Sequence, residues 1–278
     1  MKICDAHTDF LTEIKDSGER EKYVYKIRNI LKHISCAVFT TNSTICLQDV
    51  ENFKFELDGY NKKYGNKFLL SVEDIGFIKN KEELNNLIEL KPFSVTLTWN
   101  QANQFAGGAY TNKGLTKLGI GIIKLLEENN ILVDTAHLSR KAFDQFAKIT
   151  TKPIFNSHSN LNVLHEHRRN LTDGQIKEIF GSGGYVGLTM YEKFISDKKI
   201  SAKDVAKQID YVIKLVGYEH VGFGTDLYGI DEQFLPLDTK SYYDFKQIAK
   251  ELKMLNYSNK IIKAVFYKNF ENFINKTN

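Results

Sequence analysis

The sequence predicts an α/β protein built as a (β/α)8 TIM-type barrel. Eight short runs of apolar and β-branched residues alternate with helical or loop segments along the chain. The runs are apolar at successive positions, which is typical of parallel strands buried on both faces. The chain has 278 residues, close to the roughly 250 residues of one barrel, and the G-x-G-x-x-G turn of an open dinucleotide-binding sheet does not follow the first run.

The first three strands are indicated by apolar runs between charged segments. Residues 1–9 (MKICDAHTD) open with such a run, and residues 34–41 (ISCAVFTT) and 67–72 (KFLLSV) are apolar enough to form the next two strands. The Lys- and Glu-rich residues 13–32 are expected to be helical, because apolar residues recur at helical spacing near their end. Residues 50–64 form the next expected helix.

The middle of the chain continues the alternation. A short helix is expected at residues 81–90 and a fourth strand at residues 93–98 (FSVTLT), followed by a loop rich in Gly and Asn at residues 100–112. Residues 116–129 give the clearest helix, since apolar residues fall at i, i+4, i+7 and i+8. Those residues are Leu118, Ile122, Leu125 and Leu126. The fifth strand is expected at residues 131–135 (ILVDT).

The last part of the chain alternates in the same way. A helix is expected from Ser139, a favourable N-cap, to residue 149. Further strands are expected at residues 153–156, 184–189 and 220–224, and further helices at residues 172–180 and 202–216. An amphipathic helical tail at about residues 241–276 completes a single barrel domain spanning residues 1–278.

Histidines and carboxylates follow the predicted strands. His7 and Asp9 close the first strand, where side chains two positions apart share a face. The corresponding residues after strands three, five, six and eight are Glu73, His137, His158 and Asp226. Because the carboxyl ends of barrel strands form one rim, these side chains are expected to meet there. Imidazole and carboxylate ligands at one point are typical of a divalent metal site.

Each of these residues also has an ordinary structural explanation when it is taken alone. A histidine at a strand end can cap or hydrogen bond its neighbours, and a carboxylate there can belong to a turn or cap a short helix. The recurrence at five strand ends favours the metal site, because unpaired carboxylates near a core are costly. In the loop after the sixth strand, Arg168 or Arg169 could clamp a substrate carboxylate or could be a solvated arginine.

Composition argues against several other classes of function. The formal net charge is +4, with Lys scattered among Asp and Glu. The sequence has no basic stripe, so a nucleic acid partner is not expected. No apolar run approaches the roughly 18 residues of a membrane span, so no membrane association is expected. Cys4, Cys36 and Cys46 lack metal-finger spacing, and a reducing, cytoplasmic location is expected.

Seven blocks of the sequence resemble the membrane (renal) dipeptidase family of zinc metallopeptidases, in the family's order. They are DAHTD at 5–9, SVED at 71–74, GLTKLG at 114–119, LVDTAHLS at 132–139, PIFNSHS at 153–159, HRRNLTD at 167–173 and LVGYEHVGFGTDLYG at 215–229. The resemblance runs through most of the chain and implies a (β/α)8 barrel with two Zn²⁺ ions. It also implies a homodimer, for which the apolar C-terminal helices are a candidate contact.

Carried over by position, the resemblance implies a role for each site residue. The implied ligands are His7 and Asp9 for the first metal ion, Glu73 as the bridging carboxylate, and His137 and His158 for the second metal ion. Arg169 would bind the substrate carboxylate, which makes a free C-terminus a requirement. Asp226 would be the catalytic residue beside the attacking water.

One position departs from the family's pattern. The family has a histidine after the fourth strand, thought to bind the substrate carbonyl, and this chain has Trp99 in the matching LTW. An indole keeps one N–H donor, but it is bulkier and cannot carry positive charge. Loss of an oxyanion donor typically lowers the rate by about 10²–10³. Either the indole or another group therefore replaces the donor, or the substrate differs.

These inferences give the hypothesis of a dipeptidase in which two zinc ions share a bridging hydroxide that attacks the peptide carbonyl, with Asp226 passing its proton to the leaving amine. Two alternatives are open. One is a related amidohydrolase acting on another amide, lactam or ester, and the other is a catalytically silent barrel that binds metal. The sequence also leaves open the identity of the metal, the dipeptides cleaved and the oligomeric state.

Overall fold

The strands close into a complete parallel barrel, which confirms the predicted fold class. The computed structural model describes residues 2–39, 46–65 and 67–277, with the backbone alone for residues 32–39. Each strand pairs with the next one along the chain, and β1 pairs with β8. The strands are β1 Ile3–Thr8, β2 Leu31–Phe39, β3 Lys67–Glu73, β4 Ser94–Thr96, β5 Leu132–Asp134, β6 Phe155–Ser159, β7 Tyr185–Leu188 and β8 Val221–Phe223.

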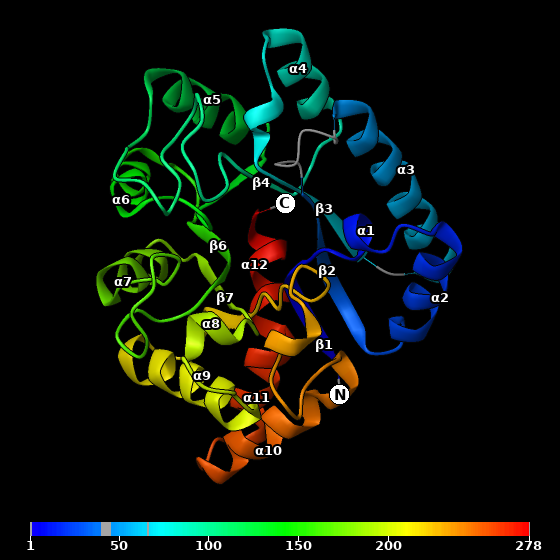
Figure 1. The fold of residues 1–278 in the computed structure, drawn as a ribbon, viewed down its shortest axis with the longest axis vertical. Coiled ribbons are helices and arrows are strands. Elements are labelled where there is room, and N and C mark those ends of the chain that lie inside the picture. Colours follow the sequence, from blue (N-terminus) through cyan, green and yellow to red (C-terminus); the bar gives the residue numbers. More distant parts are fainter. Residues whose placement is uncertain (1, 40–45, 66, 278) are drawn as a thin grey trace.

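Helices surround this barrel on the outside (Figure 1). The α-helices are α1 Phe10–Glu13, α2 Ser17–Ile27, α3 Leu47–Tyr64, α4 Lys81–Glu89, α5 Lys117–Glu128, α6 Arg140–Ile149, α7 Asp173–Gly181, α8 Glu192–Ile195, α9 Ala202–Val216, α10 Lys246–Met254, α11 Asn259–Lys263 and α12 Asn269–Thr277. Short 3-10 segments lie at η1 Ile75–Phe77, η2 Glu232–Phe234 and η3 Tyr242–Phe245, and a π-helical turn, η4, at Ala264–Lys268. Side-chain caps start several helices, since Thr116, Ser139 and Thr172 accept hydrogen bonds from backbone N–H groups of the first turn.

The segment expected to be one long helix is divided between three elements. Instead of a helix over residues 13–32, the chain forms α1, then α2, and enters β2 at Leu31. The Asp16 side chain caps α2 by accepting a hydrogen bond from Glu19 N–H, and Leu31 pairs with Ile3 of β1. Apolar residues at 27, 30 and 31 fit a helix face and the start of a strand equally well, so their spacing alone did not separate the two. Residues 40 and 41 of the expected second strand lie outside the described residues.

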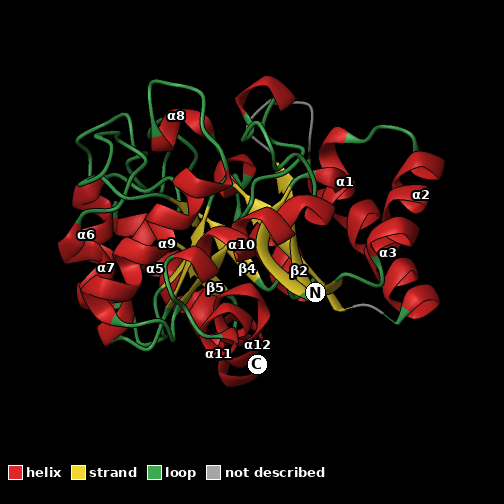
Figure 2. Ribbon diagram, turned by 90° about the horizontal axis from the view of Figure 1, so that it is seen from below, coloured by secondary structure: helices red, strands yellow, loops and turns green. Residues whose placement is uncertain are grey.

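The C-terminal tail is helical, as expected, but it is broken into short pieces and its last helix covers the bottom of the barrel. Phe270, Phe273 and Ile274 of α12 are buried against the amino-terminal ends of the strands, where they meet Cys4 of β1 and Tyr185 of β7. In Figure 2, α11 and α12 lie on the opposite side of the strands from α8. These three apolar residues therefore pack within the chain. The homodimer itself stays a prediction.

The helices in the described part of the chain are too short or too polar to serve as bilayer-crossing segments.

Replacing each of two glycines in α5 by alanine should change the stability of the protein in opposite directions. A Cβ on Gly119 would lie 2.1 Å from the carbonyl oxygen of Phe105, whereas a Cβ on Gly121 would meet no atom within 4 Å. We expect Gly119→Ala to lower the free energy of unfolding by about 1–3 kcal/mol through overpacking. Gly121→Ala should raise it by about 0.5–1 kcal/mol, because alanine loses less backbone entropy in a helix. Urea unfolding measures the free energy of unfolding of both variants. The same change in both would contradict the close packing at Gly119.

Candidate metal centre

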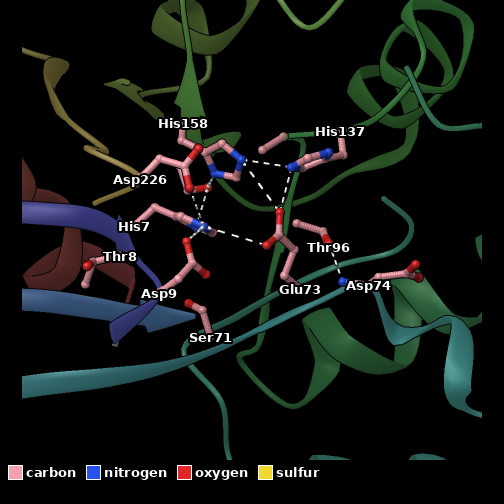
Figure 3. Close-up of polar contacts among 12 residues, drawn as sticks. His7, Thr8, Asp9, Ser71, Glu73, Asp74, Thr96, His137, His158 and Asp226 are labelled. Carbon is pink, nitrogen blue, oxygen red and sulfur yellow. Dashed lines mark hydrogen bonds and ion pairs between the residues drawn. The ribbon is translucent and has the colours of Figure 1, made fainter. Parts of the chain in front are cut away.

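Six ionisable side chains meet at the carboxyl ends of the strands (Figure 3). Three of them lie within strands: His7 in β1, Glu73 at the end of β3 and His158 in β6. The other three follow strands directly or by a few residues: Asp9, His137 and Asp226. All six are buried except Asp226, which is partly exposed. The structure thus brings together, at one rim of the barrel, residues that the sequence spreads over 220 positions.

The carboxylate of Glu73 lies at the middle of this group. Its Oε1 is 2.6 Å from Nε2 of His137 and 3.7 Å from Nε2 of His158. Its Oε2 is 3.8 Å from Nε2 of His7. The two oxygens of one carboxylate therefore face histidines on two sides, as Figure 3 shows.

A second set of carboxylates surrounds His7. Its Nε2 lies 3.5 Å from Oδ2 of Asp9 and 3.8 Å from Oδ1 of Asp226. Potential ligand atoms of His7, Asp9 and Asp226 all lie within 4.8 Å of one another, and the same holds for His7, Glu73 and His158. His7 is common to both sets, so the two parts of the site are contiguous.

The backbone departs from ideal geometry where it presents these side chains. His137 and Asp226 have φ values of 69° and 61°, in the left-handed region that non-glycine residues rarely adopt. The pairing of β1 with β2 is irregular between Asp5 and Thr8, around His7. The pairing of β6 with β7 is irregular between Asn156 and Ser159, around His158. Such irregularities re-aim side chains at a strand end, which the straight-strand rule does not foresee.

Electrostatics around His7 reflect an excess of carboxylates. Burial opposes a positive charge on His7, but the neighbouring carboxylates of Asp9, Glu73 and Asp226 outweigh it and raise the pKa of His7 to about 10. Burial raises the pKa of Glu73, against the attraction of His7. Burial, followed by the nearby Asp9 carboxylate, raises the pKa of Asp226 well above its ordinary value. Three carboxyl groups surround the single imidazole of His7, so one positive charge cannot balance all of them. The cluster therefore favours the binding of a cation.

The other two histidines are held in the neutral form. Burial lowers the pKa of both His137 and His158 well below the ordinary value, and the charges of Arg169 and His7 act in the same direction. Their Nε2 atoms are only 2.9 Å apart. The opposite ring nitrogens already have partners: Nδ1 of His137 lies 3.0 Å from Oδ1 of Asn100 and Nδ1 of His158 lies 2.8 Å from Oγ of Ser157. With these partners on the Nδ1 side, the Nε2 atoms of both rings face Glu73.

These donor groups fit divalent cations. Within the described residues, Nε2 of His7 and Oδ1 of Asp9 are buried without a hydrogen-bond partner. Buried polar atoms are normally paired, and neutral imidazoles with carboxylates are the ligands that zinc and similar metals prefer. The residues that could hold the cations are those expected from the sequence: His7, Asp9, Glu73, His137 and His158.

A pocket of about 430 Å³ opens over this cluster. Arg169 lines it and is only 4% exposed, with its Nη2 donating a 3.3 Å hydrogen bond to the carbonyl of His158. Arg168, by contrast, is exposed, donates to the carbonyl of Tyr110 and lines a neighbouring cavity. Of the two arginines, which the residue pattern alone left open, the one that lines this pocket is Arg169, the residue to which the family resemblance assigns the substrate carboxylate.

Trp99 also lines the pocket. It is 37% exposed, and its ring stacks on the imidazole of His137 with the centroids 5.8 Å apart. Sequence reasoning missed the aromatic side chains that complete the wall: Tyr110, Tyr191, Phe194, Tyr228 and Phe234. Tyr110, Tyr191 and Tyr228 lie in loops, and Phe194 and Phe234 lie in the short helical elements α8 and η2. In such segments no periodicity marks a residue as facing a site. It also missed Asn100 and Ser157, whose only signal was their position beside Trp99 and His158.

A family comparison agrees with this geometry. A sequence profile described as membrane dipeptidase (peptidase family M19) matches residues 44–277. The chain belongs to the membrane dipeptidase family. This confirms the resemblance drawn from the sequence blocks and places the chain among the peptidases, which are hydrolases. The matched region includes Glu73, His137, His158 and Asp226, whereas His7 and Asp9 precede it and reach the same rim through β1.

Individual relatives of this family member share part of its sequence. An uncharacterized protein in the pqqA 5′ region of Klebsiella pneumoniae is 30% identical over 185 residues, covering 62% of this chain and 67% of that protein. An uncharacterized dipeptidase of Schizosaccharomyces pombe is 31% identical over 180 residues, covering 62% of this chain and 43% of that protein. The matched part of the chain thus spans less than half of the yeast protein.

Solved structures share the whole fold. A metallo peptidase from Rhodobacter sphaeroides, liganded with a phosphinate mimic of the dipeptide L-Ala-D-Ala, superposes with a TM-score of 0.84 at 18% identity. The match covers 100% of this chain and 99% of that one. At this identity the likeness concerns the fold.

Proposed function

We propose that the protein is a metal-dependent dipeptidase. The observation that carries the proposal is the Glu73 carboxylate, which faces His7 on one side and the pair of His137 and His158 on the other. This arrangement lies at the base of a pocket that also holds a buried arginine, Arg169. Membership of the membrane dipeptidase family supports the reaction class, and the dipeptide mimic bound to a protein of the same fold supports the substrate class.

Two half-sites would hold the cations. The first half-site consists of His7, Asp9 and Glu73, and the second half-site consists of Glu73, His137 and His158. Zinc is the cation we propose for both, although imidazole and carboxylate ligands also suit manganese, iron or cobalt. Bound there, two divalent cations supply Lewis acidity to the peptide carbonyl and lower the pKa of a water molecule towards neutrality.

Asp226 is the proposed proton carrier. Its Oδ1 lies 3.8 Å from Nε2 of His7 and its side chain lines the pocket. Burial raises the pKa of this carboxyl, so that it can take up a proton as well as release one. Asp226 would accept the proton of the attacking water and deliver it to the leaving amine.

Arg169 is the proposed anchor for the C-terminal carboxylate of the substrate. A buried guanidinium can bind a carboxylate through two parallel hydrogen bonds, and such charged bonds contribute about 1.5–3 kcal/mol. A pocket of about 430 Å³ is suited to a small ligand. Because Arg169 and Glu73 line the same pocket, a carboxylate held at Arg169 would leave the neighbouring peptide bond near Glu73, which would favour dipeptides over longer peptides.

The direct test is hydrolysis of a dipeptide panel by protein that has been stripped of metal and reloaded with zinc. We expect activity to require the metal and a free C-terminal carboxylate, so dipeptide amides should react poorly. Longer peptides serve as the matched controls for substrate length. If the zinc-loaded protein turns over no L-L or L-D dipeptide, the proposal is wrong.

Replacing each of the two neighbouring arginines by lysine tests which of them binds the substrate carboxylate. Arg169→Lys keeps the charge but loses the paired hydrogen bonds, and it should lower kcat/KM by about 10–100-fold. Arg168→Lys is the control, because Arg168 is exposed and bonds only Tyr110 among the contacts found in the described residues; it should stay within about twofold. Steady-state kinetics on one dipeptide measures both, and equal losses would argue against an anchor at Arg169.

Trp99 distinguishes the dipeptidase from the second candidate, an amidohydrolase for another amide, lactam or ester. If the indole N–H supports the carbonyl oxygen, Trp99→His should change kcat for dipeptides by less than about tenfold, since one donor replaces another. Trp99→Phe keeps an aromatic ring without the donor and should lower kcat by about 10²–10³. If Trp99→His instead raises kcat for dipeptides by about 10²–10³, the second candidate is favoured.

A further inference from the structure

A serine hydroxyl lies between the two half-sites, on the side away from the proposed cations. Oγ of Ser157 is 2.8 Å from Nδ1 of His158, in the second half-site. The same atom is 3.5 Å from Nδ1 of His7, in the first half-site. Ser157 is 1% exposed. One buried hydroxyl therefore contacts the outer ring nitrogen of a histidine from each half-site.

The backbone of Ser157 is held tightly in place. Its N–H donates a 2.9 Å hydrogen bond to Oδ1 of Asp134, at the end of β5. Its carbonyl oxygen is packed so closely against Gly187 of β7 and Gly224, which directly follows β8, that a Cβ on either glycine would lie 1.9 Å or 1.6 Å away. Glycine at both positions permits this approach. The backbone that bears the hydroxyl is thus held by contacts with Asp134, Gly187 and Gly224.

The hydrogen-bonding capacity of the hydroxyl matches its surroundings. A serine hydroxyl accepts two hydrogen bonds and donates one. When His7 and His158 direct their Nε2 lone pairs at the proposed cations, each carries its proton on Nδ1 and can donate it to Ser157. The hydroxyl proton is then directed to Asp134, whose carboxyl is buried and hydrogen bonds the Ser157 side chain.

We propose that Ser157 is a positioning residue for the metal centre: it accepts hydrogen bonds from His7 and His158, fixes the tautomer and orientation of both rings, and couples the two half-sites. Metal-binding histidines are commonly held in this way, and loss of such a partner typically weakens metal binding 10–100-fold. The third histidine, His137, has a separate partner in Asn100. This inference rests on the metal centre of the proposed function.

The test compares two alanine variants in the same strand. Ser157→Ala removes the shared acceptor, whereas Ser159→Ala removes a buried hydroxyl that has no hydrogen-bond partner within the described residues. We expect Ser157→Ala to weaken zinc binding by about 10–100-fold, measured by competition with a chromophoric chelator. Ser159→Ala should bind zinc as the unaltered protein does. Equal zinc affinities in all three proteins would overturn the proposal.

Histidine NMR gives a second readout, and its first part uses only the unaltered protein. In the zinc-loaded, unaltered protein labelled with ¹⁵N at histidine, His7 and His158 should both carry the proton on Nδ1. A proton on Nε2 of either ring would overturn the proposal. In Ser157→Ala the Nδ1–H signals of His7 and His158 should shift while that of His137 stays, because its partner is Asn100. An unaltered protein that binds no zinc would refute the proposed function itself, a result distinct from the failure of this inference.

Discussion

Burial of several ionisable groups around Glu73 is the constraint on which this site depends. His7, His137 and His158 all face its carboxylate, and all four side chains are buried. A buried carboxylate without a compensating positive charge is costly, so this arrangement favours the binding of cations. The constraint explains why imidazoles at opposite sides of the cluster behave differently: His7, surrounded by carboxylates, favours its charged form, whereas His137 and His158 favour the neutral form.

Holding these groups together requires unfavourable backbone geometry that neighbouring hydrogen bonds offset. The backbone of His137 has a left-handed conformation. Its carbonyl oxygen accepts a 2.8 Å hydrogen bond from Ala109 N–H, which holds this conformation in place. Asp226, also left-handed, donates its N–H to the carbonyl of His7 at 3.0 Å. These bonds join the loops after β4, β5 and β8 to the rest of the rim. Strain at the site is therefore supported by the barrel around it, as is common at functional sites.

The sequence predicted the barrel and the convergence of the strand-end residues because both depend on simple repetition. Apolar runs mark the strands, and His137 or Asp226 follows such a run at a fixed place relative to the rim. The residue pattern alone could not decide between neighbours, because burial is a tertiary property. Arg168 and Arg169 differ in sequence position by one residue, yet only Arg169 lines the pocket over the cluster. The family resemblance, and not the residue pattern, singled out Arg169. Leu31 was misplaced in a helix because its apolar spacing fitted both structures.

The floor of the barrel carries a consequence for how the chain acquires its structure. Cys4 from the first strand and Phe270 from the last helix belong to one apolar cluster, although 266 positions separate them in the sequence. Translation proceeds from the N-terminus, so the strand bearing His7 emerges from the ribosome long before α12 exists to cover its base. Contacts of such long range also form slowly. Nascent chains that have not reached residue 274 would expose this apolar base to water, and chaperones would have the most to shield at that stage.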